Sequence, residues 1–179
     1  IEDDSTNISA AEPIVYLPAP GESAERFVRI KNESFEIDDS SACIVESARE
    51  LMLKNEISPV ALHPDRFNKT LLWHCAAEGA FDVLNFLMDF PDTTENLVNL
   101  CDVDNKTPLF VGAEHGHIDT VNALLASEKL TQIGFDSKDI NGRTCLWIAA
   151  SCGHVDIVRS LISNKKMSAD HMHATSDVG

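Results

Sequence analysis

The stretch "DVDNKTPLFVGAEHGHIDTVNALL" at residues 102–125 decides the fold, because it recurs along the chain. Two further stretches align with it without gaps, "DRFNKTLLWHCAAEGAFDVLNFLM" at 65–88 and "DINGRTCLWIAASCGHVDIVRSLI" at 139–162. The three copies begin at residues 65, 102 and 139, so the period is 37 residues. A fixed period of this kind is typical of proteins built from stacked supersecondary units. The sequence therefore predicts three consecutive structural repeats.

Local residue preferences predict a turn followed by two helices in each copy. An Asp followed three residues later by Asn or Gly is typical of a tight turn, since the Asx side chain bonds local backbone and Asn and Gly tolerate positive φ. The next Thr fits a helix N-cap, and the later Gly fits a left-handed helix end. Apolar residues then recur at helical spacing in the second helix. The columns are Asp65, Asp102 and Asp139 for the turns; Thr70, Thr107 and Thr144 for the caps; and Gly79, Gly116 and Gly153 for the helix ends.

The first helix of each copy opens with "TLLW", "TPLF" or "TCLW". These segments resemble the T-P-L-H-x-A signature of ankyrin repeats, with an aromatic residue in place of the His. The resemblance implies an all-α ankyrin-repeat solenoid of stacked helix-turn-helix units with finger turns. The period is longer than the roughly 33 residues usual for the family. The extra residues fall between the second helix and the next finger, and their conformation is left open.

The repeats occupy most of a chain with irregular ends. Residues 41–56, "SACIVESARELMLKNE", place Ile44, Ala48, Leu51 and Met52 on one helical face and predict a capping helix. We expect repeats over about 65–101, 102–138 and 139–175, and the start of a fourth at 176–179, so further ankyrin repeats should follow Gly179. Residues 1–40 are predicted to be irregular, either a short β-hairpin or a linker. Because the chain begins with Ile, we expect it to be a segment of a longer protein.

Composition excludes several classes of function. The 179 residues are 44% hydrophobic and 24% charged, which is ordinary for a soluble folded protein. Only 14 Lys and Arg face 29 Asp and Glu, and a net charge of −15 argues against nucleic acid or acidic membranes as partners. No apolar run reaches the ~18 residues of a membrane helix, and no signal peptide is evident. The five cysteines form no C-x-x-C pair, which favours reduced thiols and the cytoplasm, with the nucleus as the alternative.

Two groups of residues raise the question of enzyme or metal chemistry. Glu78, His115 and Cys152 share one column and form a Cys-His-carboxylate set by residue type. Packed helices lie roughly 8–10 Å apart, whereas a nucleophile and its base must approach to about 3 Å, so we predict no enzyme. His117 and His154 lie in "HGH" and "CGH" segments that lack paired Cys or helical His spacing. We interpret both as structural residues that bond nearby backbone, and we predict neither a metal site nor a cofactor.

The resemblance implies that a protein or peptide partner docks against the finger tips and the first-helix face. Lys69, Lys106 and Arg143 form a basic row on an acidic protein, and Phe67, Val103 and Ile140 form an apolar row. Together they suggest an acidic peptide with apolar anchors; the alternative readings are a solvated basic row and finger-on-finger packing of the apolar row. The candidate binding residues are Arg66, Phe67, Lys69, Val103, Asp104, Lys106, Glu114, His115, Ile140, Asn141, Arg143, Ser151 and Cys152.

By this resemblance the chain is a protein–protein interaction module of a larger intracellular scaffold or signalling protein. The main alternative is a regulatory ankyrin segment that packs on a catalytic domain of the same protein. A Cys/His enzyme is a third reading. Capture of a partner by the isolated chain would distinguish the interaction module from the regulatory segment. Triple replacement of the basic row by Glu should abolish that capture.

Overall fold

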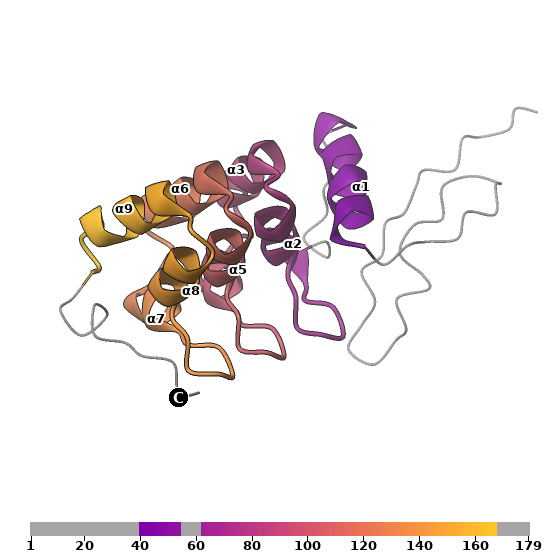
Figure 1. Ribbon diagram of the computed structural model, residues 1–179. Coiled ribbons are helices and arrows are strands. Elements are labelled where there is room, and N and C mark those ends of the chain that lie inside the picture. Colours follow the sequence, from indigo (N-terminus) through magenta and orange to yellow (C-terminus); the bar gives the residue numbers. More distant parts are fainter. Residues whose placement is uncertain (1–39, 55–61, 168–179) are drawn as a thin grey trace, which may run out of the picture.

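The computed structural model describes residues 40–54 and 62–167. This part of the chain is helical and contains no β-strand, only an isolated antiparallel bridge between Lys138 and Thr144. Figure 1 shows two rows of helices with finger loops projecting from one edge. The all-α repeat architecture is confirmed. The helices are α1 (Ser41–Lys54), α2 (Leu71–Glu78), α3 (Phe81–Asp89), α4 (Glu95–Asn99), α5 (Pro108–His115), α6 (Ile118–Ala126), α7 (Gln132–Asp136), α8 (Cys145–Ser151) and α9 (Val155–Ser163).

A predicted threonine caps the start of each first helix. The Thr70 hydroxyl oxygen accepts the backbone N–H of Trp73 at 3.1 Å, and the other two capping threonines make the same bond. This bond satisfies one of the donors that the first turn of a helix leaves unpaired. The C-cap residues of α2 and α5 are Gly79 and Gly116, which have φ of 69° and 84°. In α8 the cap is instead Cys152, and the left-handed residue is Gly153 just after it.

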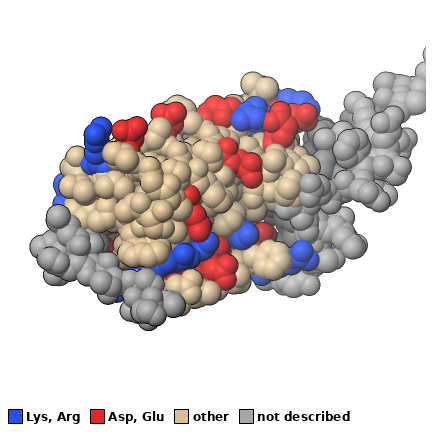
Figure 2. Space-filling model, in the orientation of Figure 1, with Lys and Arg blue, Asp and Glu red and all other residues tan. Residues whose placement is uncertain are grey.

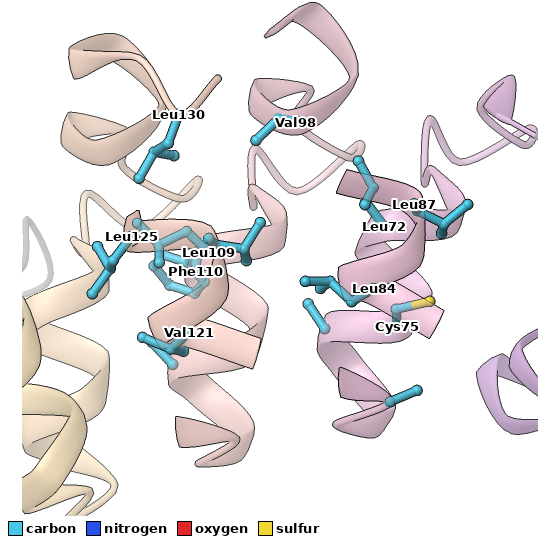
Figure 3. Close-up of a cluster of buried hydrophobic side chains, with 14 of the residues drawn as sticks. Leu72, Cys75, Leu84, Leu87, Val98, Leu109, Phe110, Val121, Leu125 and Leu130 are labelled. Atoms are coloured by element: carbon cyan, nitrogen blue, oxygen red, sulfur yellow. The ribbon is translucent and has the colours of Figure 1, made fainter. Parts of the chain in front are cut away.

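The core lies between the row of first helices and the row of second helices. Figure 3 shows leucines from successive repeats, among them Leu72, Leu87 and Leu109, in one buried layer. The first helices α2, α5 and α8 pack on one another in series, and so do the second helices α3, α6 and α9. Burying a Leu or Val side chain contributes about 1.5–3 kcal/mol, so stability depends on each repeat covering its neighbour.

The segments between a second helix and the next finger contain short helices that were not predicted. Helices α4 and α7 pack against each other, and each buries a residue, Val98 and Phe135 respectively. Asn99 joins them, because its amide N–H donates to the Lys129 carbonyl oxygen at 2.8 Å and its side-chain oxygen accepts the Thr131 N–H at 3.0 Å. These short helices thus form a third stacked element of the repeat.

Helix α1 packs against α2 and α3 and buries Val45, Ala48 and Leu51. Its Arg49 forms an ion pair with Asp82 of α3 at 2.8 Å. The predicted hairpin or linker at the amino end lies outside the described residues except for residue 40. The start of the fourth repeat also lies outside them.

Candidate interaction surface

The fingers are held in shape by the three aspartates of the turn column. In the second finger one carboxylate oxygen of Asp102 accepts the backbone N–H groups of Asp104 and Lys106, both at 2.9 Å. Asp65 and Asp139 make the same pair of bonds in their own fingers. Asn68 and Asn105 adopt φ near 60°, as the turn prediction required. Each finger is therefore a rigid loop.

Neighbouring fingers are also joined to each other. The Val103 N–H donates to the Phe67 carbonyl oxygen, and the Ile140 N–H donates to the Asp104 carbonyl oxygen, both at 3.1 Å. The side-chain amide of Asn68 adds a bond to the Cys101 carbonyl oxygen at 2.6 Å. These contacts place the three finger tips in one continuous line.

The apolar row points outward instead of packing finger on finger. Phe67, Val103 and Ile140 are 43%, 60% and 68% exposed. Such a row differs from singly scattered apolar residues, because the backbone bonds between fingers fix its spacing. The finger tips therefore offer apolar contact area to another molecule.

The basic row is arranged differently in each finger. The Lys106 ammonium lies 2.8 Å from the Glu114 carboxylate, and Arg143 forms an ion pair with the buried side chain of Asp139 at 2.5 Å. Each cation also lies over the aromatic residue four positions later. The distances from cation to ring centroid are 4.1 Å for Lys69 and Trp73, 5.7 Å for Lys106 and Phe110, and 5.7 Å for Arg143 and Trp147.

The ion pair of Arg143 has a consequence for the triple Glu replacement. Burial alone would raise the pKa of Asp139, but hydrogen bonds from Arg143 and from backbone N–H groups lower it below its ordinary value. A glutamate at position 143 would therefore face an ionised Asp139 on the same turn. The resulting repulsion makes Arg143→Glu a poor probe of binding, and neutral substitutions are preferable.

The column of Glu78, His115 and Cys152 does not form a relay in this structure. The His115 Nδ1 atom lies 3.0 Å from the Ala77 carbonyl oxygen, which can only accept, so Nδ1 carries a proton and faces the preceding repeat. Ser151 and Cys152 are exposed at the end of α8. All the candidate binding residues are exposed or half-buried, whereas Ala77, in the same column as Glu114, is buried.

His117 and His154 have the structural role that the sequence predicted. The Nε2 atom of His117 lies 3.0 Å from the Ala77 carbonyl oxygen, and that of His154 lies 3.1 Å from the Glu114 carbonyl oxygen. Each imidazole therefore ties the start of a second helix to the end of the first helix in the preceding repeat. It also lies directly against the left-handed glycine of that repeat.

A second histidine arrangement was missed from the sequence. The Nδ1 atom of His74 lies 2.9 Å from the Ser41 hydroxyl oxygen, and its Nε2 atom lies 3.6 Å from a carboxylate oxygen of Asp65. By residue type this is a Ser-His-Asp set. However, His74 is only 5% exposed, and the other oxygen of Asp65 holds the finger backbone. The set therefore links α1 to the first finger.

The same contacts set the ionisation of Asp65. Burial by itself would raise the pKa of this carboxyl group. The nearby His74 imidazole and the hydrogen bonds from the backbone N–H groups of Lys69 and Phe67 outweigh it, and the pKa lies below its ordinary value. Asp65 is thus ionised at neutral pH, with its charge directed inward.

The thiols fall into a buried and an exposed group, with Cys101 intermediate between them. Cys75 and Cys145 are buried, and burial raises the pKa of each to about 12. Cys43 and Cys152 are exposed and free.

The described residues contain no group of three or more His, Cys, Asp or Glu side chains that could hold a metal ion. None of the described helices combines the length and the apolar character that spanning a membrane requires.

Comparison with known proteins agrees with this architecture. A family model described as ankyrin repeats (3 copies) matches residues 42–134, and another described as ankyrin repeats (many copies) matches residues 109–162. No curated protein matches the chain. Proteins of this class are interaction modules that are typically non-catalytic, so a protein partner is implied. With over half of its length matched, and with its caps, finger turns and stacked helix pairs in place, this chain belongs to the ankyrin repeat family.

Proposed function

We propose that the chain binds a protein segment along its finger tips and first-helix face, as part of a larger scaffold or signalling protein. The observation that supports the proposal best is the outward apolar row of Phe67, Val103 and Ile140 on fingers joined by backbone hydrogen bonds. A fixed row lets a partner bury apolar area without first ordering the surface, and this preorganisation favours affinity.

The buried free thiols Cys75 and Cys145 fit a reducing compartment, so we place this interaction in the cytoplasm or nucleus.

A capture experiment with a matched control tests this proposal. The full chain is immobilised, and proteins retained from a cell lysate are identified by mass spectrometry and then measured individually by calorimetry. The double variant Val103→Asp with Ile140→Asp should lose the partner. Val155→Asp, an exposed apolar position at the start of α9 away from the fingers, should keep it. If both variants lose the partner equally, the partner does not bind through the apolar row.

The alternative functions give different results in the same system. A regulatory segment that packs on a catalytic domain of its own protein would retain no lysate protein but would bind that domain when the domain is added. We propose that the chain itself has no catalytic role. If a hydrolytic activity were found, its loss in both Cys152→Ala and His115→Ala would contradict this proposal.

A further inference from the structure

The three cations of the basic row are not equivalent, because two of them are already neutralised. Lys106 extends along α5 to the carboxylate of Glu114 at 2.8 Å. Arg143 is bound by Asp139, whose side chain is fully buried. A partner's carboxylate would have to compete with an existing ion pair at either position.

The first finger lacks both of these neutralising contacts. The column that holds Glu114 in the second repeat holds Ala77 in the first. Asp65, the counterpart of Asp139, is turned inward, with one oxygen on the backbone N–H groups of its finger and the other facing His74. Within the described residues, Lys69 forms no ion pair.

Aromatic rings hold Lys69 in place. Its ammonium lies 4.1 Å from the ring centroid of Trp73 and 5.7 Å from that of Phe67. Trp73 in turn packs on Ala77 and Val111 in a small apolar cluster apart from the main core. A cation held over aromatic faces keeps its charge in a fixed, partly dehydrated position. Less conformational entropy is therefore lost when an anion binds it.

We infer that Lys69 is the carboxylate-binding position of this surface, and that its partner is an extended acidic peptide segment with large apolar side chains. The inference rests on the proposed interaction function and specifies the partner's chemistry. A carboxylate on Lys69 would lie next to Phe67, from which the apolar line continues through Val103 to Ile140. In Figure 2 blue and red side chains lie beside one another along the lower edge, over the finger loops. The net charge of −15 opposes an acidic ligand at long range, so close apolar contact must accompany the ion pair.

Peptide selection tests the inference without a known partner. A phage-displayed library of random dodecapeptides is selected on the full chain, and enriched peptides are synthesised with a fluorophore for anisotropy. We expect enrichment of Asp or Glu within a few residues of an aromatic or large aliphatic residue. Lys69→Gln should raise Kd about tenfold, the equivalent of one well-made ion pair, and Lys165→Gln, at an exposed lysine beyond α9, should change it little.

A double-mutant cycle decides whether Lys69 meets the carboxylate directly. Replacing the enriched acid of the peptide by its amide should weaken binding to the wild-type chain by a similar factor, and should have no further effect on Lys69→Gln. The inference is overturned if the two losses multiply, if Lys165→Gln weakens binding equally, or if no acidic peptide is enriched. Neutral peptides that bind through Val103 and Ile140 would overturn it and leave the proposed function intact. Failure of every selected peptide and lysate protein to bind would reject both.

Discussion

Substituting Gly79 by Ala tests how the repeats are locked together. Gly79 has φ +69°, and a Cβ atom built on it would lie 2.5 Å from Nδ1 of His117 in the next repeat. An L-residue in the left-handed region costs about 1–2 kcal/mol, of which the stiffer unfolded chain returns about 0.4–1 kcal/mol. Displacing His117 also breaks its bond to the Ala77 carbonyl oxygen, about 1 kcal/mol, and strains the packing by about 1–3 kcal/mol. We expect a total loss of about 2–6 kcal/mol in the free energy of unfolding.

Gly153 provides the matched control, because its φ is +78° but no atom lies within 4 Å of a Cβ built there. Gly153→Ala should therefore cost only the net backbone strain, about 1 kcal/mol. Urea denaturation followed by circular dichroism measures both variants. In a His117→Ala background the cost of Gly79→Ala should fall to that of Gly153→Ala. Equal costs for the two glycines in the wild-type background would refute the argument that the histidine, and not the backbone angle alone, requires glycine.

Three further predictions concern thiols, pH and the short helices. Labelling of the folded chain with N-ethylmaleimide, read by mass spectrometry, should modify Cys43 and Cys152, and should reach Cys75 and Cys145 only after unfolding. Because the pKa of Asp139 is lowered in the folded state, its contribution should be complete above about pH 4 and lost as the pH falls through the folded-state pKa. Denaturation of Asp139→Asn against wild type should therefore show a stability gap that closes in acid, and a gap that widens there would contradict the assignment. Asn99→Ala should cost about 1–3 kcal/mol, since it removes the bridge between α4 and α7, whereas Asn96→Ala on the exposed side of α4 should be nearly neutral in the same assay.

Much of the fold could be predicted because the residues that form its turns and helix caps act locally. The Asp and Asn of a finger, the capping Thr and the left-handed Gly each act on backbone within a few residues, as Thr107 does on the N–H of Phe110. The helical period of Ile118, Val121 and Leu124 then identifies the buried side. Helices α4 and α7 were missed because five residues are too short for a periodic signal, and because Asn99 stabilises them through contacts with the next repeat.

The candidate site was less predictable than the fold. The sequence placed three cations in one column but could not show that Lys106 reaches Glu114 eight residues later, or that Asp65 turns toward His74. It also grouped His115 with Cys152, whereas the imidazole bonds the Ala77 carbonyl oxygen. These differences depend on where each side chain points. The alignment of the repeats shows which residues occupy equivalent positions, but not the direction of their side chains.

The sequence by itself determined that this protein is an ankyrin solenoid with finger tips of known composition, because the period repeats the same local turn, cap and helix chemistry. Only the tertiary structure decided which charges remain available at those tips. Ion pairing depends on distances of a few ångströms between side chains that stacking brings together. For that reason three cations in one column become two internal ion pairs and a single lysine, Lys69, held over Trp73 without a carboxylate partner among the described residues.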